Sequence, residues 1–565
     1  MSSPRVSRAR RRGVLLLLVG ALGVCRVSTT SPRFYPDDPI VREPESRDAS
    51  QVKPYFIGSL YEMTTNLFVT SRYKPSGTRA QNTNTIDEVP NSNWFTNRIG
   101  TRPVTLDEIV RGPNRGIPPD PSHWVLTREK TSGAHPGFTA KDANGETWFV
   151  EFDPPYFAEG ATGAVEVATK IFWAFGYNQV ETYLTTFDPR HVDIAPDATL
   201  RRPSGKRTPF TRDDMNAILE RVARRADGTY RVVAGRLLPG TILGGFQYDG
   251  TRPDDPNDIV PHEHRRELRA LRVFGAWTNL TDLKASNTLD TLVSENGRTV
   301  VKHYLQDVGS TFGMCNDLHE WDLSYEHFVQ GDTTRKRLLS FGFALSPWQT
   351  ADYIEYPSVG KFEAEVFDPR TWRPQTPTIA YLEMRDDDAF WAARRVAAFS
   401  EELIRAAVHT GEYSDPMAEK YLADVLIKRR DKIARTYLTA VNPVVDLALD
   451  ATRLTFENAA VAARVSSGPA VYRASWLRFD NATGETQPLA DTQSTATTIE
   501  APRDLPTAPG SYVAVDVSVD SQEHPVWRRP IRAYFRRDGA AWTLVGLNRV
   551  PDSAASDPDP GGRVH

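Results

Sequence analysis

Cysteine is scarce in this sequence, and neither sign of charge is in excess. Two cysteines, Cys25 and Cys315, occur among 565 residues, which excludes a disulfide scaffold and a cysteine-built zinc or iron–sulfur site. The 68 lysines and arginines stand against 72 aspartates and glutamates, so the formal net charge is −4. This balance excludes a globally basic nucleic-acid binder, and we expect no nucleic-acid partner.

Long hydrophobic runs are also missing after the first 25 residues, so no later segment is predicted to span a membrane. Apolar residues are nevertheless plentiful. Hydrophobic residues make up 40% of the chain and aromatic residues 10%, which excludes a disordered protein because there is enough apolar surface to build cores. The length corresponds to roughly three or four domains.

The N-terminus has the pattern of a signal peptide. Five arginines between positions 5 and 12 precede a short apolar run from Gly13 to Cys25. The stretch Leu22-Gly23-Val24-Cys25 resembles a bacterial lipobox, so two forms stay open: a free secreted protein, and a lipoprotein anchored through Cys25. We expect an exported protein, located in the periplasm or membrane-anchored on the cell envelope.

Changes in composition divide the chain into six predicted parts. Within the loop-rich extension, the stretch 89–98 contains a Trp-Phe pair and is predicted to be a structural clasp that packs on the following domain. The parts are a signal peptide (1–25), the loop-rich N-terminal extension (26–120), a β-rich region (121–248), a helical region (249–441), a small all-β domain (442–551) and a disordered tail (552–565).

Hydrophobic periodicity predicts the elements within these parts. The fold class predicted is α+β. Strands are expected at 124–127, 137–141, 147–152, 180–187, 230–238, 470–479, 511–519, 531–535 and 542–547, and helices at 163–175, 213–226, 265–278, 388–409 and 418–437.

The stretch from Asn279 to Gly309 carries the most informative polar residues. Asp282, Lys284 and Asn287 are followed, after a predicted β-hairpin, by Asp307 two residues before Gly309. Phosphoryl transfer needs a carboxylate for the acceptor hydroxyl, a cation for the moving phosphoryl group and two oxygen ligands for a divalent metal. The hairpin is expected to bring the two predicted metal ligands, Asn287 and Asp307, together at its base.

In these motifs the chain resembles the protein-kinase-like superfamily, over about residues 121–440. Asp282 to Asn287 matches the catalytic loop, and Asp307-Val-Gly309 matches the metal-binding Asp-Phe-Gly. The closer likeness is to the atypical HipA and spore-coat CotH kinases, because Lys130 to Gly137, with Gly133, looks like the HipA nucleotide loop, and Glu166 matches the helix-C glutamate. The resemblance implies a two-lobed kinase-like domain, with a β-rich N-lobe and a helical C-lobe.

The resemblance also implies the ligands. ATP is the expected co-substrate, with Mg²⁺ or Mn²⁺, and the acceptor stays unknown: a protein, a carbohydrate or a small molecule. Asp282 and Lys284 are then the catalytic residues, Asn287 and Asp307 hold the metal, and the nucleotide site includes Gly133, Gly137, Glu151, Glu166 and Lys170.

One residue departs from the family pattern. The third strand, 147–152, carries Glu151 where such kinases place a lysine, and a carboxylate repels phosphate. Lys170 follows Glu166 by one helical turn, and we predict that it pairs with Glu151. Three functions therefore remain open: an active kinase-like enzyme, a related enzyme that transfers AMP, and a catalytically inactive scaffold or binding protein of the cell envelope.

A weaker candidate for metal binding lies between the two predicted regions. His262-Glu263-His264 offers two imidazoles two residues apart, a spacing that does not converge on one ion from the start of a helix. We interpret this stretch as a solvated hinge.

Overall fold

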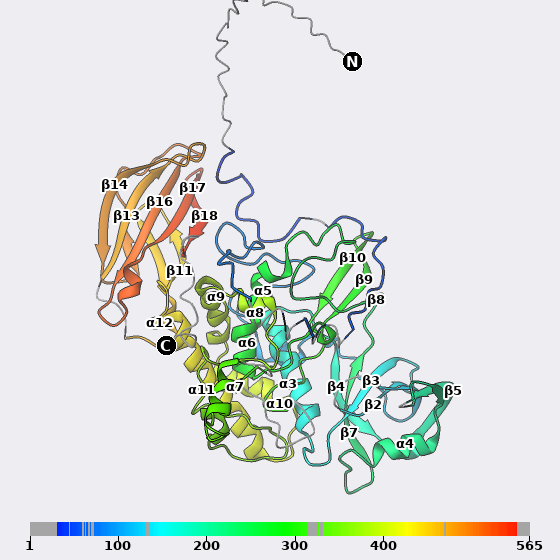
Figure 1. The fold of residues 1–565 in the computed structure, drawn as a ribbon. Helices are drawn as coiled ribbons and strands as arrows, with labels where there is room; N and C mark the ends of the chain where they lie inside the picture. The colour runs from blue at the N-terminus through cyan, green and yellow to red at the C-terminus, as the bar shows by residue number, and fades with distance from the viewer. Residues whose placement is uncertain are drawn as a thin grey trace, which may run out of the picture.

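The computed structural model shows a mixed α+β protein, as the sequence predicts (Figure 1). It describes residues 31–44, 46–58, 62, 64–65, 68, 73–130, 135–202, 204–314, 326–327, 331–467 and 471–550. The predicted signal peptide and the predicted tail lie outside these residues. A sheet-rich region is followed by helices and then by further sheets, which Figure 1 shows at the lower right, the centre and the upper left.

A seven-stranded sheet forms the first region, in the order β4-β7-β3-β2-β1-β5-β6. Neighbouring strands run antiparallel except β1 and β5, which run parallel. All five strands that the sequence predicts here are present. The strands are β1 (Trp124–Glu129), β2 (Gly137–Lys141), β3 (Thr147–Phe152), β4 (Thr182–Phe187), β5 (Val192–Arg201), β6 (Arg207–Pro209) and β7 (Tyr230–Arg236).

The two faces of this sheet differ. Trp148, Val150 and Phe152 alternate along β3 and are buried in a core that the helix α4 (Arg212–Leu219) closes. Since successive side chains of a strand point to opposite faces, Glu151 lies on the other face. The sequence predicts a helix over 213–226, but α4 ends at Leu219.

The helix α3 lies on the same face as Glu151. Arg231 of β7 belongs to this face and donates from Nε to Thr162 Oγ1 of α3 at 2.8 Å. At its other end α3 joins the helical core, where the rings of Phe175 and Phe274 stack with centroids 3.7 Å apart. The helices are α2 (Leu106–Arg111), α3 (Gly160–Phe175), α5 (Arg266–Arg269), α6 (Leu271–Thr278), α7 (Gly331–Leu339), α8 (Ile379–Leu382), α9 (Asp386–Ala397), α10 (Glu401–His409), α11 (Pro416–Leu438) and α12 (Ala459–Ala462).

One predicted helix is two helices. The sequence predicts a single helix over 388–409, whereas α9 ends at Ala397 and α10 begins at Glu401. Ser400 caps α10, because its hydroxyl accepts the N–H of Leu403 at 3.2 Å. Phe399 is buried beside Trp277, with ring centroids 4.9 Å apart. A serine cap thus interrupts a stretch whose apolar period continues through the break.

A second sheet connects the first region to the helices. It contains β8 (Thr241–Gly244), β9 (Leu289–Glu295) and β10 (Arg298–Tyr304), in the order β10-β9-β8. The β9–β10 hairpin is the one that the sequence predicts between Asn287 and Asp307. The N-terminal extension runs along both edges of this sheet: Ala49 donates its N–H to the Thr299 carbonyl at 2.8 Å, and Tyr55 donates to Leu243 at 2.7 Å.

The stretch 89–98 packs as the predicted clasp. Trp94 stacks on the ring of His303 at a centroid distance of 3.5 Å. Phe95 is fully buried and meets Tyr177 edge-on at 5.7 Å. The two aromatic side chains therefore fix the extension to the end of β10 and to the segment after α3.

Two further sheets follow the last long helix. Their apolar side chains are continuous with the helical core. Arg549 joins the parts by donating from Nη2 to the Val444 carbonyl at 2.9 Å and by lying 4.3 Å over the ring of Phe390 in α9. One sheet is β11 (Val444–Leu449), β12 (Arg453–Asn458) and β15 (Thr498–Glu500); the other is β14 (Thr486–Ser494), β13 (Val471–Phe479), β16 (Tyr512–Asp520), β17 (Ile531–Asp538) and β18 (Ala541–Asn548), in these orders.

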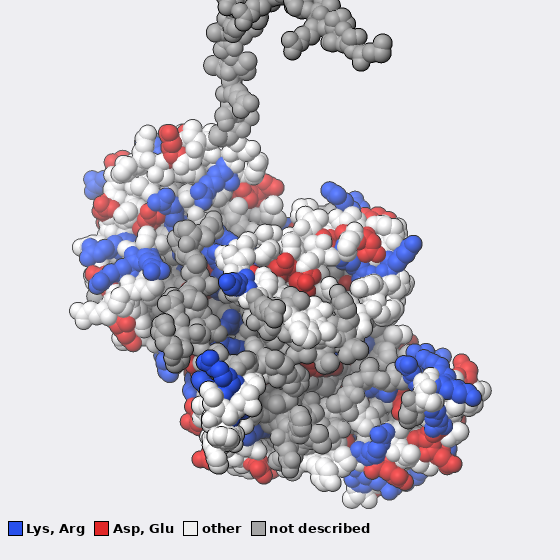
Figure 2. Space-filling view, viewed as in Figure 1, with Lys and Arg blue, Asp and Glu red and all other residues white. Residues whose placement is uncertain are grey.

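The surface carries both signs of charge. Figure 2 shows lysine and arginine side chains interspersed with aspartate and glutamate on the face in view, including the region of β5 and α4. Among the residues that the structure describes, no helix is long and apolar enough to cross a membrane.

Candidate active site

The predicted catalytic loop and the predicted metal-binding turn lie side by side at the base of the β9–β10 hairpin. Asp307 donates its backbone N–H to the Asn287 carbonyl at 2.9 Å. Thr281 donates its N–H to the Ser310 carbonyl at 3.0 Å. The hairpin therefore brings Asn287 and Asp307 together, as the sequence predicts.

The catalytic loop begins where α6 ends. Asn279 adopts a left-handed conformation, with φ +58°, and its side-chain oxygen accepts the indole N–H of Trp372 at 2.8 Å. Leu280 and Leu283 are then buried, so Asp282 beside them is left at the surface. The buried leucines thus leave the side chains of Asp282 and Lys284 partly exposed.

Asp282, Lys284 and Asn287 interact with one another within this loop. Lys284 Nζ lies 2.6 Å from Asp282 Oδ2, and both side chains are partly exposed. Asn287 donates from Nδ2 to the Asp282 carbonyl at 2.9 Å. Because this bond occupies the nitrogen, it fixes which end of the Asn287 amide is the donor and which is the acceptor.

Asp307 lies at the surface, but neighbouring protein groups crowd its carboxylate and displace part of its hydrating water. The N–H of Gly309 donates to Asp307 Oδ1 at 3.0 Å. The loss of hydrating water raises the pKa of Asp307, and the charge of Glu151 raises it further, while the Gly309 N–H and Lys130 oppose the shift. The carboxylate of Asp307 therefore lies within electrostatic reach of the sheet that carries Glu151 and Lys130.

Close packing explains this proximity. A Cβ at Gly309 would lie 2.8 Å from Val165 Cγ2 of α3, so the Asp307 turn approaches α3 more closely than a side chain at Gly309 allows. The first turn of α3 is tied to the end of β3, since Asp153 accepts the backbone N–H and the hydroxyl of Thr162, each at 2.8 Å. The turn consequently lies beside the end of β3.

Glu151 has a partner other than the one predicted. Lys130 Nζ lies 2.9 Å from Glu151 Oε1, and the two side chains are 22% and 30% exposed. The predicted pair of Glu151 with Lys170 is wrong. Lys170 Nζ instead lies 2.7 Å from Glu166 Oε1, where the side chains are 1% and 7% exposed.

The Glu166–Lys170 pair faces β4 and α2. Glu166 accepts the hydroxyl of Thr182 at 2.6 Å. The aliphatic chain of Lys170 passes over Gly112, where a Cβ would lie 2.5 Å from Lys170 Cδ. Burial raises the pKa of Glu166, and Lys170 and Thr182 oppose the shift. Glu166 and Lys170 thus form a sealed pair. This pair is separate from the partly exposed groups around Asp307.

The predicted nucleotide loop is described at its ends. Gly133 lies outside the described residues. Gly137 begins β2 directly opposite Glu151, and its carbonyl accepts the N–H of Lys130 at 2.9 Å. Lys130, Gly137 and Glu151 therefore lie in a row across three strands.

Two residues at the site were not found from the sequence. Glu62, from the N-terminal extension, accepts the N–H of Ala285 through Oε1, and its Oε2 is buried with no hydrogen-bond partner in the described part of the chain. Burial raises the pKa of Glu62, which the N–H groups of Ala285 and Ser286 and the charge of Lys284 oppose. A lone glutamate 223 residues before Ala285 carries no sequence signal for this position.

Tyr248 is the second such residue. It is 4% exposed, and its hydroxyl is buried without a hydrogen-bond partner in the described part of the chain. Burial raises its pKa well above the usual range, and the charges of Glu62 and Asp282 add to the shift. The tyrosine is therefore a neighbour of both carboxylates at the catalytic loop.

The donor set fits a magnesium ion that shares its coordination with phosphate. No group of three or more His, Cys, Asp or Glu side chains within the described ranges can hold a metal ion. Asp307 and Asn287 supply hard oxygen donors at one place, and Mg²⁺ in nucleotide sites takes one or two carboxylates together with substrate phosphates and water. These two residues suit that mode of binding.

The candidate His262–His264 stretch proves to be structural. His262 is 3% exposed, and its Nε2 lies 2.7 Å from Asp258 Oδ2, so the predicted solvated hinge is wrong at this residue.

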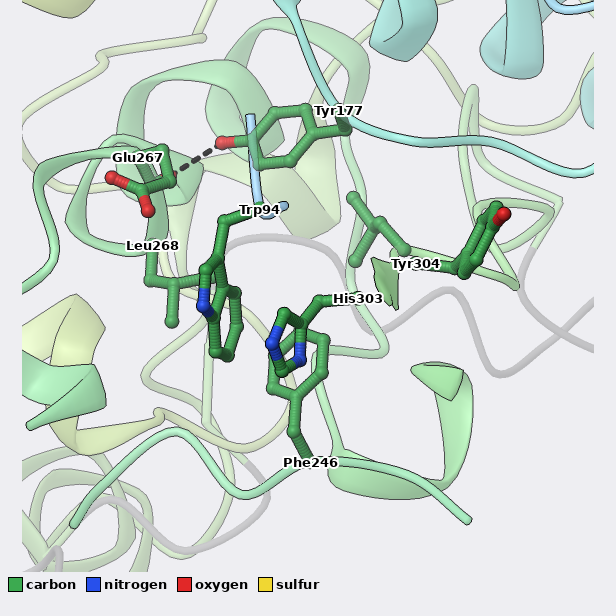
Figure 3. A pocket seen from close by; sticks show the side chains of 8 residues that line it. Trp94, Tyr177, Phe246, Glu267, Leu268, His303 and Tyr304 are labelled. Carbon is green, nitrogen blue, oxygen red and sulfur yellow. Dashed lines mark hydrogen bonds between the residues drawn. The ribbon is translucent and has the colours of Figure 1, made fainter. Parts of the chain in front are cut away.

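Nearby, Trp94, Phe246 and His303 line a small cavity with room for about one water molecule (Figure 3). A cavity of this size is too small for a nucleotide.

Comparison with known proteins finds structural similarity. No protein-family model matches the chain, and no curated protein matches it by sequence. The crystal structure of the Golgi casein kinase is similar at 11% identity and a TM-score of 0.28, and the match covers 70% of this chain and 94% of that one. A second structure of that kinase, with Mn/ADP bound, is similar at 10% identity and a TM-score of 0.27, and the match covers 70% of this chain and 96% of that one. The crystal structure of the Helicobacter pylori proinflammatory kinase CtkA is similar at 10% identity and a TM-score of 0.27, and the match covers 56% of this chain and 95% of that one.

Proposed function

We propose that this chain is an atypical kinase-like phosphotransferase that binds a magnesium–nucleotide complex between the seven-stranded sheet and the helices. The observation that carries the proposal is the assembly of Asp282, Lys284, Asn287 and Asp307 at one place. The backbone hydrogen bonds from Asp307 to Asn287 and from Thr281 to Ser310, and a β9–β10 hairpin without a register shift, hold the two segments together. This assembly supports a kinase-like site for phosphoryl transfer.

Each residue has a role in the transfer. The acceptor oxygen forms a bond to the terminal phosphorus, the bond from that phosphorus to the leaving nucleoside diphosphate breaks, and the acceptor proton passes to Asp282. Lys284, 2.6 Å from Asp282, supplies positive charge next to the moving phosphoryl group. Asp307 and Asn287 would hold the divalent cation, which when bound neutralises phosphate charge.

Two variants separate binding from transfer. Asp307→Ala removes a metal ligand and is expected to abolish nucleotide binding that depends on Mg²⁺ or Mn²⁺. Asp282→Ala leaves that ligand in place, so nucleotide should bind while transfer falls by about 10²–10⁴-fold, the usual contribution of a positioned base. Calorimetric titration with ATP and transfer of ³²P from labelled ATP measure the two quantities.

A matched control is Asp193→Ala. Asp193 is exposed on β5 and belongs to no part of the site, so binding and transfer should stay at wild-type levels. Absence of any nucleotide and metal response in the wild-type protein would refute the enzyme proposal. The second candidate, an inactive kinase-fold scaffold of the cell envelope, would then take its place, and Glu151 in the position of the family lysine is the observation that favours it.

The position of the ³²P label in ATP distinguishes a kinase from an enzyme that transfers AMP. Transfer from γ-labelled ATP indicates a kinase, whereas transfer from α-labelled ATP indicates movement of AMP. The acceptor in either case is proposed only as a nucleophile whose proton Asp282 takes. Export, to the periplasm or as a membrane-anchored protein on the cell envelope, with or without a lipid on Cys25, is part of the proposal because of the N-terminal pattern.

A further inference from the structure

The strand β3 carries no lysine at the site, but a lysine that follows β1 reaches Glu151 on β3. Lys130 follows the last residue of β1, and its Nζ lies 2.9 Å from Glu151 Oε1 on β3. Between these strands lies β2, which begins at Gly137. The lysine therefore crosses one whole strand to meet the glutamate.

The lysine chain crosses β2 at Gly137, which has no side chain to stand in its way. Gly137 is hydrogen-bonded to Lys130 on one side and stands opposite Glu151 on the other. A Cβ at Gly137 would meet the Val150 carbonyl oxygen first and would lie 3.2 Å from Lys130 Cδ, so the lysine chain runs over the glycine. The arrangement places the ammonium group above β3, on the face that α3 and the Asp307 turn share.

The Lys130–Glu151 pair is accessible to a ligand. The side chains are 22% and 30% exposed, unlike those of the sealed Glu166–Lys170 pair. An ammonium group has three N–H donors, and one carboxylate oxygen at 2.9 Å engages one of them. The remaining donors suit phosphate oxygens, and the pair with Glu151 restricts the rotation of a long side chain.

We infer that Lys130 is the cation that binds the nucleotide phosphates, and that Glu151 is a positioning residue that holds it there. This inference rests on the proposed function. It explains how a carboxylate is tolerated beside a triphosphate: Glu151 does not face the phosphates alone, because its charge is balanced by the lysine that it positions.

The first test removes the charge while keeping the length of the chain. With Mg-ATP as the probe, Lys130→Met should weaken binding by about 10- to 100-fold, the range for a charge-assisted hydrogen bond. Binding of adenosine, which has no phosphate, should not change. Lys130→Arg should retain most of the affinity. Lys141→Met, on the exposed end of β2, is the matched control and should bind ATP as the wild type does.

The second test moves the lysine instead of deleting it. In Lys130→Met/Glu151→Lys the cation returns to the same point from β3, so ATP binding should recover to within a few-fold of wild type. Recovery is not expected if Lys130 acts only by stabilising the β1–β2 hairpin, since the double variant keeps methionine at position 130. Thermal unfolding of each variant identifies any that fails to fold.

The outcomes separate this inference from the proposed function. If the wild type binds Mg-ATP and Lys130→Met binds it equally well, the inference is wrong and the enzyme proposal stands. If Lys130→Met loses ATP and adenosine binding together, or the relocated lysine restores nothing, phosphate binding by Lys130 is likewise refuted. If the wild type binds no nucleotide at all, the proposed function fails and the inference fails with it.

Discussion

Replacing Lys170 by methionine tests the sealed pair beneath the site. The wild-type Nζ lies 2.7 Å from Glu166, and the two side chains are 1% and 7% exposed. Methionine preserves most of the volume but leaves Glu166 as a buried charge without its cation. Removing one partner of a buried ion pair costs about 3–5 kcal/mol in the free energy of unfolding, because the remaining charge has no compensation.

The loss should depend on pH. Burial already raises the pKa of Glu166, and Lys170 opposes that shift, so Lys170→Met raises the pKa further. A carboxyl whose folded-state pKa exceeds its unfolded value favours the fold below the unfolded pKa, and this stability is lost as pH rises through the folded pKa. The variant should therefore be closer to wild type at pH 5 than at pH 8, with each pKa unit worth about 1.4 kcal/mol.

Urea unfolding of two double-mutant cycles measures the pairing directly. Glu166→Gln combined with Lys170→Met should recover much of the single-variant loss, which indicates strong coupling. Glu151→Gln combined with Lys170→Met should be additive within about 0.5 kcal/mol. A strong coupling between Glu151 and Lys170, with none between Glu166 and Lys170, would refute this account and restore the pairing that the sequence suggested.

Further predictions concern the loop, the turn and the N-terminus. Glu62→Ala should lower the free energy of unfolding by about 1 kcal/mol and slow transfer, because the N–H of Ala285 loses its acceptor. Glu62→Gln keeps an acceptor oxygen, so unfolding and turnover assays should give values close to wild type. The pKa of Asp307 is raised, so this carboxylate takes up a proton at a higher pH than an ordinary aspartate does. Calorimetry should therefore show that metal-dependent nucleotide binding weakens at this higher pH as the solution is acidified. Equal binding down to pH 4 would contradict this. Cys25→Ser should release the protein from the membrane fraction of the native host if that cysteine carries a lipid; an unchanged fraction rejects the lipoprotein form.

Strong periodicity and the order of motifs were readable from the sequence. The β9–β10 hairpin and the meeting of Asn287 with Asp307 follow from two alternating segments around a tight turn. The Glu166–Lys170 pair also had a sequence signal, because a glutamate four residues before a lysine on one helix places the two side chains together. This pairing within one helical turn is the one that forms, in place of the predicted pair with Glu151.

Other contacts had no local signal. The partner of Glu151 depends on the register of three strands and on the missing side chain at Gly137, neither of which a single segment encodes. Glu62 reaches the catalytic loop because the extension first runs along the edges of the second sheet, a path set by tertiary pairing. The break before Ser400 shows local capping chemistry prevailing over an uninterrupted apolar period.

The position of Phe34 has a consequence for the order of folding. Phe34 packs among Tyr512, Tyr534 and Phe479 of the C-terminal sheet, and its N–H donates to Asn481 Oδ1 at 2.8 Å, across 447 residues of sequence. Phe34 therefore reaches its place only after the C-terminal sheet that receives it has been synthesised. Such distant contacts slow folding, because a very long loop must close before they form. The beginning of the extension consequently docks late, after the sheet that receives it has formed.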